Sequence, residues 1–197
     1  METQTFSKKE KEEIIRYGLD RIKSTCTMTL VTLLMGCIFQ VFFQSIVFLV
    51  CFIVLRKYAG GYHADTQNRC YVISTVIIAV ALLAIRYTQA GNNNVIFIFL
   101  QSLNFVLLWF LVPVDNKNHC LEQWEKERYG KKAKKRLIYM YALSIILYFF
   151  AMSNIAVAVG VSNLTVGGCA IAGKIKNIVL KRRGEKESAF ELNKKSF

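Results

Sequence analysis

The chain has 197 residues, of which 54% are hydrophobic and 13% aromatic, and it contains a single proline. A soluble domain of this size cannot bury so much apolar surface, which excludes an ordinary soluble protein. The 26 Lys and Arg against 13 Asp and Glu give a net charge of +13. Because these charges form blocks between apolar segments, they indicate contact with a membrane surface rather than with nucleic acid.

The N-terminal segment, residues 1–25, predicts an amphipathic helix. It begins with a charged cluster instead of the short basic flank and apolar core of a signal peptide, so we expect no signal peptide. From Ile14 onward apolar residues recur with helical spacing, while Arg16, Asp20 and Arg21 lie on the other side. Such a helix either lies in the headgroup layer of a bilayer or docks on the rest of the protein.

Apolar segments follow at residues 26–55, 71–85, 95–114, 137–160 and 161–180. A membrane-spanning helix needs about 20 residues, so the first segment is too long for one upright crossing and short for two. Lys and Arg are concentrated in four regions: before this segment, in the 56–70 connector, in the loop at residues 117–136 and in the C-terminal tail. The positive-inside rule places all four regions in the cytoplasm, which requires residues 26–55 to form two short or re-entrant helices. We expect their turn between Gly36 and Gln44, where polar side chains can satisfy backbone groups: Gln40, Gln44 and Ser45.

The predicted fold is therefore all-α, a polytopic membrane bundle of about six passes with an N-terminal amphipathic interfacial helix. One domain covers residues 1–197. It comprises the amphipathic helix (1–25), the transmembrane bundle (26–180) and a basic cytoplasmic tail (181–197).

The connector at residues 56–70 carries the best candidate for chemistry. A thiol becomes a nucleophile as its thiolate is stabilised, which helix N-termini and neighbouring cations both do. Cys70 has both, because Arg69 precedes it and the apolar helix is expected to start at Tyr71. Free N–H groups at this helix start can also hold an oxyanion. Arg56 and Lys57, at the other end of the connector, are interpreted as markers of the lipid boundary.

His63 is the candidate general base. On a straight helix it would lie about 10.5 Å from Cys70, so the two side chains can meet only if the backbone between them bends. Asp65 and the polar residues after it favour such a turn, and Gly61 contributes the necessary backbone freedom. Asp65 is also a candidate for orienting the imidazole.

Other interpretations of these residues remain open at this point. His63 and Cys70 can be simple interfacial residues of a basic loop, because a spacing of seven is a weak signal. A zinc site formed by His63, Cys70, His119 and Cys120 is a second alternative, although neither pair has the usual spacing of a zinc finger. We expect no metal and no other cofactor.

The connector resembles the signature of the accessory gene regulator B (AgrB) family. The resemblance rests on the run Arg56-Lys57-Tyr58-Ala59-Gly60-Gly61-Tyr62-His63-Ala64 with Cys70 after it. It extends to the charged N-terminal helix, to the apolar segment before the connector, and to Trp109-Phe110-Leu111-Val112-Pro113-Val114-Asp115-Asn116-Lys117-Asn118 with the basic loop that follows. His119-Cys120 departs from the Lys-Pro often found at this place in the family.

The resemblance implies a membrane cysteine endopeptidase with Cys70 as nucleophile and His63 as base. It implies an AgrD-like propeptide as substrate, cleaved before its acidic C-terminal tail to leave a thioester on the cysteine. A Cys or Ser of the propeptide then closes a thiolactone or lactone ring, giving a quorum-sensing peptide. The resemblance also implies a homodimer in the bacterial cell membrane, with the site facing the cytoplasm.

A dense cationic block lies in the loop before residue 137. Its residues include Lys131, Lys132, Lys134, Lys135 and Arg136. They either attract the acidic tail of the propeptide or contact anionic lipid. The alternative function is a non-enzymatic transport or assembly partner that uses this loop for docking. Ion-coupled transport is disfavoured, because no acid or base lies well inside an apolar segment except Lys174 and Lys176, near the inner end of the last helix.

Overall fold

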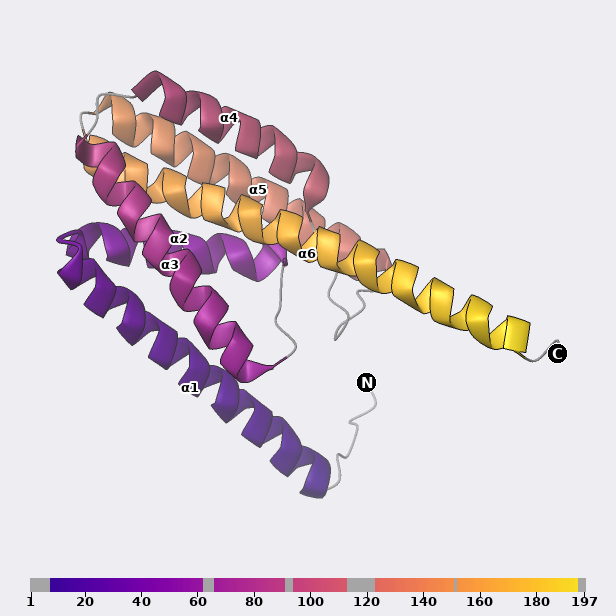
Figure 1. Ribbon diagram of the computed structural model, residues 1–197. Helices are drawn as coiled ribbons and strands as arrows, with labels where there is room; N and C mark the ends of the chain where they lie inside the picture. Colours follow the sequence, from indigo (N-terminus) through magenta and orange to yellow (C-terminus); the bar gives the residue numbers. More distant parts are fainter. Residues whose placement is uncertain (1–7, 62–65, 91–93, 113–122, 151, 195–197) are drawn as a thin grey trace, which may run out of the picture.

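The computed structural model describes residues 8–61, 66–90, 94–112, 123–150 and 152–194. Within these ranges the chain forms six α-helices and no strand, which confirms the all-α prediction. The helices are α1 (Lys8–Ile38), α2 (Phe42–Ala59), α3 (Gln67–Ala90), α4 (Asn94–Leu111), α5 (Gln123–Phe149) and α6 (Ser153–Lys194). The amphipathic segment continues without a break into the first part of the 26–55 apolar segment, and together they form α1, whose N-terminal part extends away from the bundle (Figure 1).

The apolar segment at residues 26–55 is divided between two helices, as predicted. α1 ends at Ile38 and α2 begins at Phe42, with Gln40 between them at a positive φ of 57°. The Val41 N–H donates to the Gly36 carbonyl at 2.8 Å, so the backbone groups at the end of α1 are satisfied locally. Gly36 also lets α2 approach closely, since a Cβ at this position would lie 2.7 Å from Cβ of Ser45.

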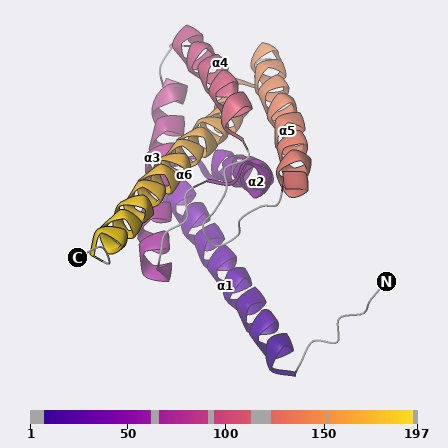
Figure 2. The same cartoon turned by 90° about the vertical axis from the view of Figure 1, so that its right-hand side faces the viewer.

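α6 is the central helix of the bundle. It packs against α2, α3, α4 and α5, which surround it in the rotated view (Figure 2). Inside the bundle, 67% of the apolar span of α6 is buried, against 17% of the span of α3. Gly160 and Gly167 of α6 make room for Gln101 and Asn104 of α4, and the Asn104 side-chain amide donates to the Asn163 carbonyl at 2.9 Å.

Two hydrophobic clusters lie at opposite ends of the bundle. The first joins the start of α2 to the end of α3 and the start of α6, and includes Phe48, Leu82 and Val157. The second joins the ends of α2 and α4 to α5 and α6, and includes Leu55 and Leu137. We call the second end the basic end, because the cationic residues of α2 and α5 lie there.

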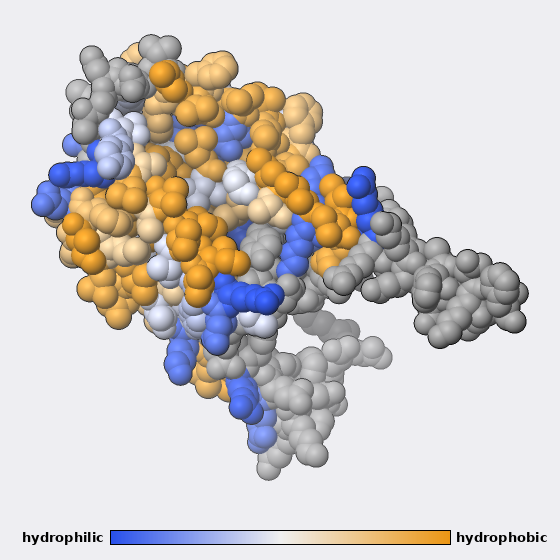
Figure 3. All heavy atoms as spheres, in the orientation of Figure 1, coloured by the Kyte–Doolittle hydropathy of each residue, from blue (hydrophilic) through white to orange (hydrophobic). Residues whose placement is uncertain are grey.

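The surface of the bundle is that of a membrane protein. Three helical segments are long and apolar enough to cross a membrane: Phe42–Ala59, Asn68–Thr88 and Ser153–Leu180. Two shorter apolar segments, Ile22–Ile38 and Ile96–Leu111, accompany them. Large apolar side chains cover most of the face seen in Figure 3, and hydrophilic residues gather mainly at its lower and right-hand borders. The number of passes, about six, stays a prediction.

Candidate active site

Cys70 lies in the first turn of α3. The helix begins at Gln67, four residues before the expected start, because Thr66 caps it. The Thr66 hydroxyl accepts a hydrogen bond from the Arg69 N–H at 3.4 Å, and its carbonyl accepts one from the Cys70 N–H at 3.0 Å. Cys70 is therefore half-buried within the positive end of the helix dipole, while the Arg69 side chain is exposed.

Arg56 is the site residue that the sequence interpretation missed. It lies in the last turn of α2, and its Nη1 donates to the Gly60 carbonyl at 2.8 Å. Arg56 lines the same cavity as Cys70 and Cys169. It therefore has contacts inside the bundle in addition to its position at the end of an apolar segment. The sequence did contain a signal for this role. The pair Gly60-Gly61 follows Arg56 closely enough for the arginine side chain to hydrogen-bond to its backbone.

The Gly60-Gly61 turn depends on this arginine. Both glycines have positive φ, 72° at Gly60 and 126° at Gly61, where other residues are strained. Gly61 is buried between the Arg56 guanidinium and the backbone of α6, and a Cβ at Gly61 would overlap Nη1 of Arg56 and lie 2.9 Å from the Cys169 carbonyl oxygen. The role predicted for Gly61 through backbone shape agrees with this packing.

A cavity of about 290 Å³ adjoins Cys70 between α1, α2, α3 and α6. Arg56 and Cys169 also line it. Apolar side chains form most of the other walls: Met28, Phe48, Leu49, Phe52, Ile53, Ile73, Ile77 and Ile78. Hydroxyl groups complete the lining: Ser24, Thr25, Thr29, Thr32 and Ser74. The nucleophile candidate and a cation therefore line the same cavity.

Several predicted site residues lie outside the described part of the chain. His63 and Asp65 belong to residues 62–65, and His119 and Cys120 belong to residues 113–122. The pairing of His63 with Cys70 therefore stays a prediction. Of the alternative zinc ligands only Cys70 is described, and the described residues contain no group of three or more potential metal ligands.

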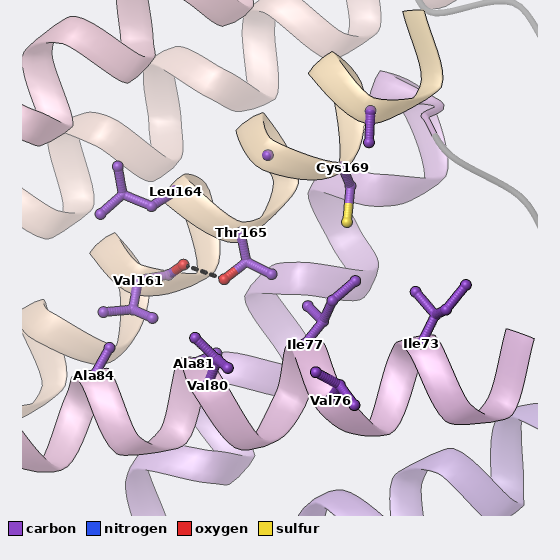
Figure 4. Close-up of a pocket in the computed structure, with 12 residues that line it drawn as sticks. Ile73, Val76, Ile77, Val80, Ala81, Ala84, Val161, Leu164, Thr165 and Cys169 are labelled. Carbon is purple, nitrogen blue, oxygen red and sulfur yellow. Dashed lines mark hydrogen bonds between the residues drawn. The ribbon is translucent and has the colours of Figure 1, made fainter. Parts of the chain in front are cut away.

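A second, larger cavity of about 550 Å³ lies between α3 and α6 (Figure 4). Its lining is apolar except for the Cys169 thiol and Thr165, whose hydroxyl donates to the Val161 carbonyl at 2.7 Å. It offers no acid, base or cation to a reaction. Ile73, Ile77 and Cys169 line both cavities, so this groove adjoins the cavity of Cys70.

The predicted tail-binding residues all lie on α5, from its third turn toward its middle, but their surroundings differ. Arg136 stacks on the Tyr58 ring, 3.8 Å from its centroid, and donates to the Val54 carbonyl at 3.1 Å. Lys132 also lies over Tyr58, at 5.9 Å. The other ring contacts are those of Lys134 with Trp109 and of Lys135 with Tyr139. Lys131 is exposed.

Arg136 thus ties α5 to the last turns of α2, immediately before the Gly60-Gly61 turn. We expect Arg136→Ala to lower the free energy of unfolding in detergent by about 2 kcal/mol, because it removes a cation–π contact and a charged hydrogen bond together. Lys134→Ala, which removes a cation–π contact with Trp109, should cost less than about 1 kcal/mol. Chemical unfolding followed by circular dichroism measures both, and equal losses would contradict a special role for Arg136.

Comparisons with known proteins identify the family of the chain. The sequence profile of the family AgrB, Accessory gene regulator B, matches residues 1–173. An AgrB-like protein 2 of Clostridium perfringens (strain 13 / Type A) is 30% identical over 183 residues, which cover 87% of this chain and 86% of the relative. An AgrB-like protein of Clostridium perfringens (strain SM101 / Type A) is 29% identical with the same coverage. No solved structure matches the chain. The chain therefore belongs to the accessory gene regulator B family, whose members act in accessory gene regulator quorum sensing.

Proposed function

We propose that this protein is a membrane cysteine endopeptidase that cleaves an AgrD-like propeptide and promotes its cyclisation. The observation that carries the proposal is the position of Cys70, in a capped first helical turn and on the wall of a cavity that also holds Arg56. The thiol lies at the positive end of the helix dipole and shares its cavity with a guanidinium group, a setting typical of cysteine nucleophiles. Membership of the family supports the same assignment.

In the proposed reaction the Cys70 thiolate attacks the carbonyl carbon of the bond before the propeptide tail. The tetrahedral oxyanion collapses, the C–N bond breaks, and His63 gives a proton to the leaving amine. Because the N–H groups of Arg69 and Cys70 are both bonded to Thr66, those of Gln67 and Asn68 are the candidates for holding the oxyanion. A thiol or hydroxyl of the propeptide then attacks the thioester, closes the ring and releases Cys70.

His63 follows Gly61 by two residues in the sequence. Gly61 lies against Arg56, which lines the cavity of Cys70. The described chain resumes at Thr66, the cap of the helix that carries the thiol. The positions of Gly61 and Thr66, on either side of residues 62–65, support the proposed pairing of His63 with Cys70. Asp65 is the proposed orienting residue.

Forming a thioester from an amide is unfavourable, whereas exchange of one thioester for another is nearly neutral. Holding the released acidic tail would draw the first step forward. Lys131 and Lys135 suit this role best, since both are exposed at the basic end whereas Arg136 is engaged with α2. By the positive-inside rule this end faces the cytoplasm.

Trapping the acyl-enzyme tests the proposal. The protein is co-expressed with a propeptide whose ring-closing Cys or Ser is changed to Ala, so that the thioester cannot be resolved internally. We expect a mass increase equal to the N-terminal fragment of the propeptide, located at Cys70 and removed by hydroxylamine. An adduct on another residue, or tail release without any adduct in a rapid-quench series, would overturn the covalent mechanism.

A further inference from the structure

We propose that the cavity beside Cys70 receives a bulky apolar side chain of the propeptide, from the residue whose carbonyl the thiol attacks. This inference rests on the proposed function and names the substrate preference of the same site. The cavity would thereby hold the acyl part of the substrate before and after the thioester forms.

The cavity extends from the thiol into the bundle. Along α3 its lining residues run from Cys70 to Ile78, and along α2 they run from Arg56 to Phe48. Eight residues of helix rise about 12 Å, which is the approximate length of the cavity. Its volume of about 290 Å³ is at the lower limit of small-molecule pockets, so it suits a side chain rather than a folded peptide.

The chemistry of the walls selects an apolar occupant. Among the described residues that line the cavity, Arg56 is the only charged one, and it lies at the same end as Cys70. The inner end is formed by Phe48, Leu49 and Ile78, together with Thr32. The Thr32 hydroxyl is already bonded to the Met28 carbonyl at 2.7 Å. A charged side chain would therefore lose its hydration without gaining a partner at this depth.

Aromatic and aliphatic groups of a substrate would find matching surfaces. Phe48 and Phe52 stack on one another, with ring centroids 5.8 Å apart and planes inclined by 17°, and they form a flat wall of α2. Ile73 and Ile77 of α3 line both this cavity and the larger cavity between α3 and α6. Ser74 lies one helical turn after Cys70 on the same face, so a side chain that enters past the thiol must pass it.

The test narrows the cavity at Ser74 and varies the side chain that enters it. The residue before the cut in the propeptide is changed to Phe, Leu, Ala or Asp, and tail release is followed by mass spectrometry. With the wild-type protein we expect Phe and Leu to be processed about 10- to 100-fold faster than Ala, and Asp more slowly still. Ser74→Leu should reduce processing of the Phe propeptide at least 10-fold while changing that of the Ala propeptide less than about 3-fold.

Thr75→Leu is the matched control, because Thr75 is the next residue on α3 and does not line the cavity. It should leave the order of the four propeptides unchanged. Retained processing of the Ala propeptide shows that Ser74→Leu folds. Equal loss with all four propeptides, or an unchanged ratio of Phe to Ala processing in Ser74→Leu, would overturn the inference.

Alkylation gives a readout that does not need catalysis. The experiment uses vesicles and proteins in which Cys70 is the only cysteine. It measures the ratio of the alkylation rate with N-benzylmaleimide to that with N-methylmaleimide. This ratio should be higher with Ser74 present than in Ser74→Leu, and partition of the reagents into lipid does not affect the comparison because it is the same for both proteins. An unchanged ratio would overturn the inference even if Cys70 is the nucleophile. A changed ratio together with tail release by Cys70→Ala would instead contradict the proposed function and leave the apolar binding site standing.

Discussion

Cys70→Ala is expected to abolish release of the propeptide tail, with a loss of at least about 1,000-fold. Removing the nucleophile of a covalent mechanism removes the thioester and leaves only binding and oxyanion stabilisation. His63→Ala should cause a loss of similar order, because the two groups act as a unit. Co-expression of each variant with the propeptide, followed by mass spectrometry of the tail, measures the effect.

Cys26→Ala is the control for this comparison. Cys26 is exposed on α1 and does not line the cavity, so the variant should process the propeptide at the wild-type rate. Continued tail release by Cys70→Ala, at a rate near that of Cys26→Ala, would refute the assignment of the nucleophile. It would favour the alternative of a non-enzymatic partner for transport or assembly.

Gly61→Ala is expected to lower tail release by about 10- to 100-fold without loss of membrane insertion. The backbone at Gly61 has φ of 126°, which costs other residues about 1–3 kcal/mol. The new Cβ would also displace the Arg56 guanidinium or the Cys169 carbonyl, which the glycine now touches. The turn that leads to His63 would shift away from Cys70, and a displacement of about 1 Å at a reacting group can cost about 100-fold in rate.

Gly168→Ala is the matched control for Gly61→Ala. It also adds a single methyl group near the basic end of the bundle, but a Cβ at Gly168 would meet no atom within 4 Å. Its rate of tail release and its amount in the membrane fraction should equal those of the wild-type protein. A Gly61→Ala protein with unchanged turnover would show that the turn is not needed to bring the catalytic groups together.

The start of α3 shows where sequence patterns lose accuracy. Apolar periodicity indicates Tyr71 as the first helical residue, whereas α3 begins at Gln67. The difference arises because the capping hydrogen bonds of Thr66 stabilise a polar first turn that carries no hydrophobic signal. The correction moves Cys70 inside the helix, where its N–H is bonded and its side chain lines a cavity.

Hydropathy and charge by themselves determined that this chain is a helical membrane protein, that its first apolar segment turns back near Gly36, and that Cys70 lies at a helix start. These properties depend on residues close together in the sequence, through helix length, turn formation and the cost of burying charge in lipid. Only the tertiary structure decided the role of Arg56. Arg56 packs against the Gly60-Gly61 turn and lines one cavity with Cys70 of α3 and Cys169 of α6, and packing between helices leaves no periodic pattern in any one of them.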